Sequence, residues 1–387
     1  MTITSERDGS LDAMRGIAAL SVFGWHAMLA FYPESSGYFG DAPIELTARS
    51  QFWFVAFNGP GAVAFFFVLS GFVLARASLI TGRTDNLTRG LLKRWPRLAG
   101  PALVAVLSSW ALFALGFYFY QPAALVTHSP WLAEFGGAAG GPTDHCFSAA
   151  VLQGAVFTFL RGDSSYDSSL WTMAYEFYGS LMVYALGFLL APRPNAALRG
   201  AVIAMAGLAC AAVNPALTPF VVGFALAAFL PSGRLRAAPG LAAVTVALAL
   251  LVCGYTDGAR GFYAPFAMVL PPWLPLPALY AAAAAALIAA VESWPGLQRG
   301  LSSRWGRICG ELSFPFYLIH LPVLCSAGAF ALLATGSRAT AIGATLAIAI
   351  GAAFLLALVN RWWLATLNLA VAALLTRRPA AAAVSPS

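Results

Sequence analysis

The first apolar segment of the chain carries three ionisable residues, two of which are suited to chemistry inside a membrane. In LDAMRGIAALSVFGWHAML, residues 11–29, Asp12, Arg15 and His26 interrupt an otherwise apolar run. Arg15 and His26 are eleven residues apart. This spacing is three helical turns plus about 20°, so both project from one helix face, about 16 Å apart along the axis. Histidine acts as a general base near neutral pH, and arginine binds anions.

Each of these residues also has a simpler interpretation. Arg15 could be an anchor whose charged end reaches the lipid headgroups, with Asp12 as its ion-pair partner three residues earlier. His26 lies well inside the segment, where an anchor has no use, so its alternative is a structural hydrogen bond between helices. We expect His26 to face the bundle interior or a water-filled path, because polar groups inside membrane spans usually do.

Two later apolar segments carry further ionisable residues. Glu176, in SLWTMAYEFYGSL, lies as far from the outer end of its segment as His26 does from its own. If the two helices are neighbours, His26 could be a general base whose tautomer Glu176 sets; a proton relay is the competing function. His320 follows Tyr317 in ELSFPFYLIHLPVL, where Pro315 is expected to kink or open the helix. We expect His320 to line that opening rather than merely pack.

A basic cluster precedes the third apolar segment, in TGRTDNLTRGLLKRWPRLAGP. Arg94 and Arg97 flank Trp95 and Pro96 there, and two arginines at this spacing could bind phosphate oxygens as a fork. A basic cluster at this place is equally typical of a signal for lipid headgroups and topology. The residues alone leave both interpretations open.

The elements that must position these residues are predicted to be membrane helices. Hydrophobic residues make up 60% of the chain and charged residues 10%, against roughly 25% charged residues in a soluble domain. Apolar windows long enough to cross a bilayer predict an all-α polytopic membrane protein. We expect ten spans, at residues 11–31, 52–80, 97–119, 170–190, 197–213, 216–231, 238–254, 277–293, 311–334 and 339–359.

The distribution of basic residues predicts the orientation. With these ten spans, 18 of the 22 Lys and Arg residues fall at one end of the bundle. That end, and both termini, should therefore be cytoplasmic. A further window at 146–160 would break this asymmetry if it crossed, so we expect a re-entrant or surface-lying segment. Residues 1–10 are then a cytoplasmic N-terminal segment, 11–360 the membrane domain, and 361–387 a cytoplasmic tail.

Other features limit the possible functions. The net charge of +7 is explained by the positive-inside rule, so no nucleic-acid partner is expected. The five cysteines show no spacing typical of a metal site or a disulfide framework. From the polar start of the chain we expect no removable signal peptide. The outer segments 32–51 and 120–169 are rich in aromatic and acidic residues, Asp167 among them, which suits carbohydrate but is also common in solvated loops.

Five stretches, in this order, resemble the acyltransferase-3 family of membrane O-acyltransferases: LDAMRGIAALSVFGWH, FFFVLSGFVLAR, KRWPRL, LWTMAYEFYGSL and SFPFYLIHLPVL. The resemblance extends from about residue 10 to about residue 360. It implies a ten-helix enzyme that moves an acyl group, usually acetyl from acetyl-CoA, to a hydroxyl of a cell-surface glycan, a lipid-linked sugar or a secreted small molecule. The expected location is the inner, cytoplasmic membrane.

The resemblance also implies functions for individual residues. His26 falls on the catalytic histidine of the family and Glu176 on its acidic residue. The residues expected to bind the CoA donor are Arg15, Arg94, Arg97, Ser70 and Gly71, and those expected to contact the substrate are Tyr317, His320 and Trp171. No metal is required.

The expected mechanism starts with CoA docked from the cytoplasm against the arginines, so that its thioester is presented near His26. His26 would either deprotonate the acceptor hydroxyl or carry the acyl group itself. One competing function is a proton-coupled exporter or flippase that uses His26, Glu176 and His320 as a relay. Another is a scaffold subunit of a polysaccharide assembly complex. The sequence does not determine the acceptor or the oligomeric state.

Overall fold

The structure is a computed structural model that describes residues 9–137, 141–143, 145–230, 237–271 and 273–376. In this part of the chain every regular element is helical. The long helices are α1 (Gly9–Phe31), α3 (Gly59–Thr81), α4 (Asp85–Ala114), α9 (Trp171–Leu190), α10 (Ala196–Val213), α11 (Thr218–Phe229), α12 (Pro239–Gly254), α14 (Leu276–Ser293), α16 (Arg304–Val323) and α18 (Arg338–Thr376). The short ones are α2 (Pro33–Ser36), α5 (Tyr120–Thr127), α6 (Pro130–Ala133), α7 (Phe147–Leu152), α8 (Thr158–Leu160), α13 (Ala264–Val269), α15 (Pro295–Leu301) and α17 (Ala329–Thr335).

The prediction of an all-helical membrane protein is confirmed. Each of the ten apolar windows falls on a helix, because runs of this length and hydropathy can satisfy their backbone groups in lipid only as helices. Among the described residues, eight helices are long and apolar enough to cross a membrane. The windows at 216–231 and 238–254 fall on α11 and α12, which are shorter.

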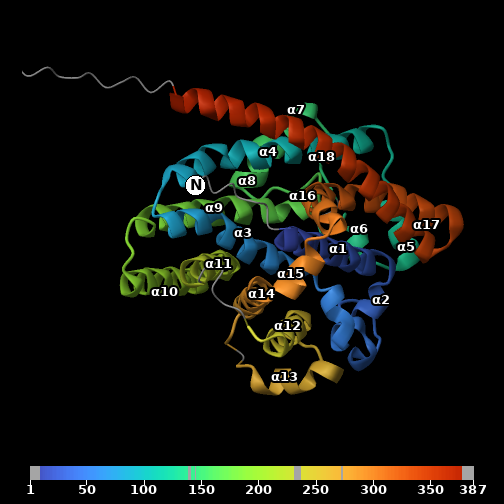
Figure 1. Ribbon diagram of the computed structural model, residues 1–387. Coiled ribbons are helices and arrows are strands. Elements are labelled where there is room, and N and C mark those ends of the chain that lie inside the picture. The colour runs from blue at the N-terminus through green and yellow to red at the C-terminus, as the bar shows by residue number, and fades with distance from the viewer. Residues whose placement is uncertain (1–8, 138–140, 144, 231–236, 272, 377–387) are drawn as a thin grey trace, which may run out of the picture.

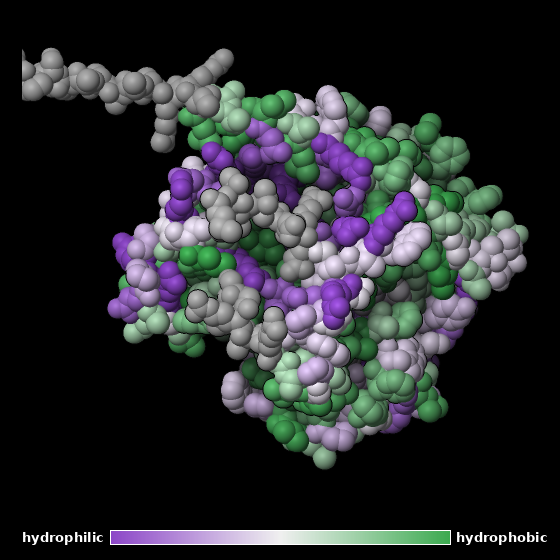
Figure 2. Space-filling view, viewed as in Figure 1, coloured by the Kyte–Doolittle hydropathy of each residue, from purple (hydrophilic) through white to green (hydrophobic). Residues whose placement is uncertain are grey.

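The helices form one bundle with α1 and α3 at its centre (Figure 1). α1 packs mainly against α16 and α3, and α3 packs against α9 and α11. α4 and α18 lie side by side along one flank, and α10, α12 and α14 lie on the other. We call the end of the bundle where α1 begins the basic end, and the opposite end, which carries α5 and α6, the loop end. Figure 2 shows hydrophilic residues gathered around a hollow in the face viewed, with hydrophobic residues spread over much of the surrounding surface.

Two helix starts differ from the prediction. α3 begins at Gly59 instead of residue 52, because the Asn58 side chain caps it by accepting a hydrogen bond from the backbone of Gly61 (3.4 Å). α4 begins at Asp85 instead of residue 97 and continues through Pro96. The basic cluster is therefore part of a helix instead of a connector, and the direction of each arginine side chain is fixed by the helical turn.

The last helix is also longer than predicted. α18 has 39 residues, or about 58 Å of helix against a hydrocarbon core of about 30 Å. Its final third packs against α4: the Trp363 indole donates to the Pro96 carbonyl (2.8 Å), and the Lys93 amine donates to the Asn368 amide oxygen (2.7 Å). Residues 361–376 therefore belong to the helical bundle and not to a tail, and residues 1–8 and 377–387 lie outside the described part.

The segment at 146–160, expected to be re-entrant or surface-lying, runs along α4 and then turns back. The Trp110 indole of α4 donates to the His145 carbonyl (2.8 Å), and the Trp95 indole donates to the Ala155 carbonyl (3.0 Å). These tryptophans are fifteen residues apart on α4, about 22 Å along its axis. The chain then turns back. The carbonyl of Tyr166 accepts a hydrogen bond from the hydroxyl of Ser109, the residue before Trp110 on α4. The segment enters along α4 and leaves at the loop end.

Close packing of α3 on α11 depends on two glycines. A Cβ added at Gly71 would overlap the carbonyl oxygen of Phe220, and one added at Gly223 would overlap the carbonyl oxygen of Val68. The two helices therefore approach through their backbones, as small residues allow in membrane bundles. The structure thus gives Gly71 a different function from the predicted one in donor binding, because its side-chain position is filled by α11.

Replacing Gly71 with alanine is expected to destabilise the bundle. The carbonyl of Phe220 cannot rotate away as a side chain would, so the helices must separate, at a typical cost of about 1–3 kcal/mol. The midpoint of thermal unfolding of the purified protein in detergent should fall. Gly343→Ala in α18 is the matched control, since nothing lies within 4 Å of the added methyl group. Equal midpoints for the two variants would contradict the close contact.

Candidate active site

Two cavities inside the bundle meet at a common wall. The first, of about 220 Å³, is lined at the basic end by Arg15, Arg94, Arg97, Ser70 and Glu176, together with Thr172, Met173 and Ser313; we call it the arginine cavity. The second, of about 460 Å³, is lined by His26, Trp25, Trp131, Trp171 and Tyr280; we call it the aromatic cavity. Val63, Phe67 and Tyr317 line both. The arginine and the histidine of α1 thus face two adjoining cavities, as their common helix face predicts.

A buried ion pair forms the floor of the arginine cavity. Arg94, which is 6% exposed, is paired with the carboxylate of Glu176, and the Ser70 hydroxyl donates to the same carboxylate oxygen (2.7 Å). The Arg94 guanidinium also contacts the Ser70 hydroxyl and the Glu176 carbonyl, both at 3.4 Å. Its Nε is buried without a hydrogen-bond partner among the described residues. A donor that is buried and unsatisfied in this way favours an acceptor atom from a ligand.

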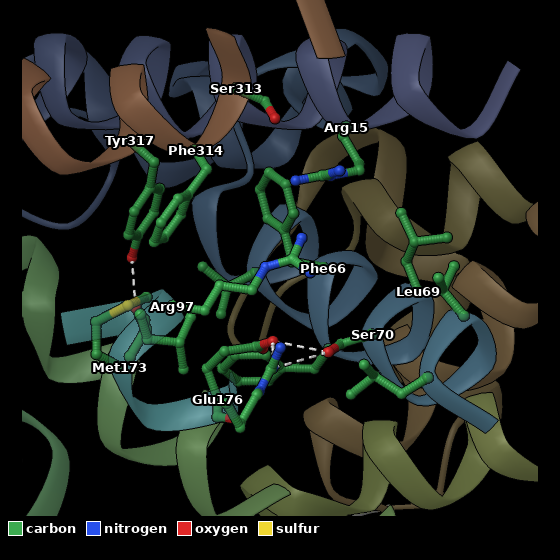
Figure 3. Close-up of a pocket in the computed structure, with 17 residues that line it drawn as sticks. Arg15, Phe66, Leu69, Ser70, Arg97, Met173, Glu176, Ser313, Phe314 and Tyr317 are labelled. Carbon is green, nitrogen blue, oxygen red and sulfur yellow. Dashed lines mark hydrogen bonds and ion pairs between the residues drawn. The ribbon is translucent and has the colours of Figure 1, made fainter. Parts of the chain in front are cut away.

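Arg15 and Arg97 extend into the same cavity from α1 and α4 (Figure 3). Arg15 also donates to Asp12 at 3.3 Å, the predicted pair at a spacing of three. Ser70, predicted with the arginines, lies beside them through its bond to Glu176. Three guanidinium groups around one carboxylate give the cavity a net positive charge, which suits an anionic ligand.

His26 is hydrogen bonded to the other histidine that the sequence analysis selected. The Nδ1 of His26 lies 2.8 Å from the Nε2 of His320. The two rings are inclined by only 3° and their centroids are 5.1 Å apart, so they lie edge to edge in one plane, as a direct N–H···N bond requires. His320 is 1% exposed, and its Nδ1 lies 2.8 Å from the carbonyl oxygen of Tyr317.

This chain of bonds determines where the protons of the neutral pair lie. Since a carbonyl oxygen only accepts, Nδ1 of His320 carries a proton and its Nε2 is an acceptor. Nδ1 of His26 must then donate to that nitrogen, which leaves Nε2 of His26 with its lone pair. His26 lines the aromatic cavity. The arrangement is that of a general base with an orienting partner, in which a histidine and a carbonyl take the place of a carboxylate.

The predicted pairing of His26 with Glu176 is therefore wrong. Glu176 is held by Arg94 and Ser70, and His320 holds His26. Equal depth in two helices does not decide which residues meet, because each helix can face any neighbour. Pro315 was expected to kink or open its helix, and the helix does not open there: α16 runs without interruption from Arg304 to Val323 with this proline inside it.

Trp131 covers His26 from the loop end. Its ring lies 5.2 Å from that of His26 at an angle of 21°. Trp131 belongs to α6. The hydroxyl of Ser129, the N-cap residue of α6, donates a hydrogen bond to the carbonyl of Leu29 in α1 (2.7 Å). The sequence showed Trp131 only as one aromatic residue of a long outer segment. Nothing in its spacing could place it over a residue more than a hundred positions earlier.

Hydroxyl groups gather where the two cavities meet. The Tyr317 hydroxyl lies 2.8 Å from that of Thr172 and 2.9 Å from the carbonyl of Ser169. Thr172 lines the arginine cavity, whereas Tyr317 lines both. Trp171, the predicted substrate contact beside Thr172, lines the aromatic cavity. The sequence analysis did not select Thr172, which lies on the same α9 helix one turn before Glu176.

Asp167 anchors the turn just before α9, in which the carbonyl of Ser169 accepts the hydrogen bond from Tyr317. It is 0% exposed, and one carboxyl oxygen accepts from the backbone N–H (3.0 Å) and hydroxyl (2.8 Å) of Ser169, while the other has no partner among the described residues. Burial raises the pKa of this carboxyl from 3.8 to about 7. The sequence analysis counted Asp167 among the acidic residues of an outer segment, but the structure buries it.

The stability of the fold should depend on pH through Asp167. The folded state holds this proton more tightly than the unfolded chain does, so the stabilisation is complete below about pH 4 and is lost as the pH rises to about 7. The midpoint of thermal unfolding, measured relative to that of Asp167→Asn, should therefore fall by several degrees between pH 4 and pH 8. A difference between the two proteins that is the same at every pH would contradict this assignment.

Comparison with known proteins assigns the chain to a family. No curated protein and no solved structure matches it. The family model described as an acyltransferase domain matches residues 8–358, nearly the whole chain. This range contains both cavities, the Arg94–Glu176 pair and the two histidines. The chain is a member of the acyltransferase-3 family, and the site just described lies within a membrane acyltransferase domain.

Proposed function

We propose that the protein transfers an acetyl group from acetyl-CoA to a hydroxyl group of an acceptor, which makes it an O-acetyltransferase. Acetyl-CoA binds with its phosphates at the arginine cavity, and the acceptor binds in the aromatic cavity. The observation that carries this proposal is the shared wall: a cationic cavity and a cavity with a base adjoin at Tyr317. A thioester and a hydroxyl can meet there within reach of His26.

The chemistry follows from the tautomer of His26. Its Nε2 takes the proton of the acceptor hydroxyl as the acceptor oxygen attacks the thioester carbonyl carbon. The positive charge that develops on the ring is stabilised through Nδ1–H and His320. When the tetrahedral intermediate collapses, the C–S bond breaks and the CoA sulfur takes the proton back. The products are the acetyl ester and CoA, and the histidine pair returns to its starting state.

The negative charge of the intermediate also needs a donor. The hydroxyls of Tyr317 and Thr172 lie at the wall where the thioester carbonyl would be placed. The Tyr317 hydroxyl now donates to the carbonyl of Ser169. If it turned toward the thioester oxygen, it would stabilise the negative charge there, as the donors of an oxyanion hole do. The alternative in which His26 carries the acetyl group uses the same Nε2 lone pair and would leave label on the protein after rapid quenching.

The proposed orientation places the arginine cavity toward the cytoplasm. Its support is the distribution of Lys and Arg, which gather at the basic end. The acetyl group would then enter from the cytoplasm and leave at the loop end, within an inner membrane. Cell-surface glycans, lipid-linked sugars and secreted molecules would all be reached there.

The test is acetyl transfer by membrane vesicles that contain the protein. With acetyl-CoA labelled in the acetyl group, the protein should release CoA and produce a labelled ester, and His26→Ala vesicles should not. The proton-coupled exporter gives a different result: a pH gradient would drive accumulation of a compound that stays unmodified, without consumption of acetyl-CoA. That outcome would overturn the proposal.

Replacing His320 is expected to impair catalysis without weakening donor binding. Phenylalanine at this position cannot accept the Nδ1–H of His26, so the base loses its tautomer and orientation, and kcat should fall roughly 10²–10⁴-fold. The carbonyl oxygen of glutamine can still accept, so His320→Gln should retain more activity than His320→Phe. The acetyl-CoA KM should stay unchanged in both, because the arginine cavity is intact. Equal activity of the two variants would contradict the orienting function.

A further inference from the structure

We infer that the final third of α18 holds the arginines of α4 in place for the donor, with Trp363 as the positioning residue. This inference rests on the proposed function and deepens it, because it concerns how the groups proposed to bind acetyl-CoA are held. The contacts that carry it lie at residues 361–368, beyond the range 8–358 that the family model matches. They join α18 to α4 and α16, and both of these helices line the arginine cavity.

The arginines of α4 lie in a stretch of helix that two prolines weaken. Pro96 and Pro101 are both inside α4, and a proline has no backbone N–H to donate to the carbonyl four residues earlier. Two of the backbone hydrogen bonds of a regular α-helix are therefore missing between residues 92 and 101. Arg94 and Arg97 belong to this stretch, so the directions of their side chains depend on contacts that neighbouring helices make with it.

Trp363 meets α4 between the two prolines. Its indole N–H donates to the carbonyl oxygen of Pro96 (2.8 Å). The indole also occupies the space beside Gly100, where an added Cβ would lie 2.4 Å from the indole nitrogen. Pro96 and Gly100 are four residues apart and share one face of α4. A contact at both points resists rotation and sliding of the helix at the turn that carries Arg97.

Two further contacts attach the same part of α18. The Lys93 amine of α4 donates to the Asn368 amide oxygen (2.7 Å), and the Arg361 guanidinium is paired with the carboxylate of Glu311 in α16. Both contacts are exposed to solvent, and exposed polar pairs contribute little to stability. We therefore assign the positioning function to Trp363, whose ring is packed against the backbone of α4.

The experiment measures donor affinity in full-length variants. In membrane vesicles supplied with labelled acetyl-CoA, Trp363→Ala should raise the acetyl-CoA KM about tenfold. The maximal rate of ester formation should stay close to that of the wild type, because the two histidines are untouched. CoA should also bind the purified protein more weakly in isothermal titration calorimetry. Trp362→Ala is the matched control, since that indole is 71% exposed on the same helix, and it should change neither quantity.

The possible results separate this inference from the proposed function. If the wild type formed the ester and Trp363→Ala had the same acetyl-CoA KM, the inference would be overturned and the acyltransferase function would stand. A lower maximal rate and a lower unfolding midpoint, without a higher acetyl-CoA KM, would indicate a general loss of structure and would also overturn the inference. No ester formation by the wild type would overturn both.

Gly100→Ala tests the same contact from the side of α4. The added methyl group would overlap the Trp363 indole and displace it, so the acetyl-CoA KM should rise as it does in Trp363→Ala. In the double variant the methyl group meets no indole, and the KM should match that of Trp363→Ala instead of rising further. Effects that add in the double variant would show that the two residues act separately, which would overturn the assignment.

Discussion

His26→Ala is expected to lower the rate of acyl transfer roughly 10²–10⁴-fold, the usual contribution of a general base. Alanine removes the Nε2 lone pair that takes the acceptor proton, whereas the arginine cavity and its three guanidinium groups stay in place. The acetyl-CoA KM should therefore stay close to the wild-type value. The measurement is transfer of labelled acetyl to the acceptor in membranes that contain equal amounts of each protein.

The control for this prediction is a histidine outside the site. His128 is exposed at the end of α5 with a φ of 54°, and asparagine tolerates this left-handed conformation. His128→Asn should keep full activity. If His26→Ala also kept full activity at normal expression, the chemical basis of the proposed function would be lost. A loss of activity with a lower unfolding midpoint would instead indicate that His26 acts through the fold, because its bond to His320 joins α1 to α16.

Arg94→Met is expected to destabilise the protein by about 3–5 kcal/mol, the typical result of removing one partner of a buried ion pair. The side chains of Arg94 and Glu176 are 7% and 16% exposed, so the remaining carboxylate would keep only the Ser70 hydroxyl among its present partners. The midpoint of thermal unfolding in detergent should fall clearly. Donor binding should weaken as well, since one of the three guanidinium groups is gone.

A double variant separates these two effects. In Arg94→Met combined with Glu176→Gln, position 176 no longer carries the negative charge that lost its partner Arg94. Much of the lost stability should therefore return. Activity should not return, because the arginine that is proposed to bind the donor phosphates is still missing. If the double variant recovered acetyl-CoA affinity together with stability, Arg94 would serve only to neutralise Glu176. If the double variant were as unstable as Arg94→Met, the two residues would not form the pair that the structure shows.

The two-cavity arrangement explains why charged residues are unevenly distributed within the bundle. In the proposed function, the phosphates of a CoA donor require cations, and these are supplied by arginines of α1 and α4. The base requires a lone pair and an orienting partner, and these are placed near the other end of α1 and on α16. Tyr317 and Thr172 join the two places. In the proposed function, transfer across this wall would move an acyl group along the bundle axis without a separate transport step.

The helices could be located from the sequence because hydropathy is a local property. A run of about 20 apolar residues must form a helix in lipid whatever surrounds it, and every predicted window lies on one. The shared face of Arg15 and His26 is local in the same sense, since it depends only on 3.6 residues per turn. Helix ends were less accurate. α4 starts twelve residues earlier than predicted, because its polar first turns continue the helix outside the apolar window, and α18 continues past Asn360 and Arg361 to Thr376.

By itself, then, the sequence determined an all-helical membrane protein, its family resemblance, and the residues that carry charge inside it. Only the tertiary structure decided the pairs: Glu176 with Arg94, His26 with His320, and Trp131 over His26. It also decided that Gly71 packs against α11 and that Asp167 is buried. The physical reason is that a partner on another helix depends on which helices are neighbours and how each is rotated. Neither quantity is contained in the spacing of residues along one segment.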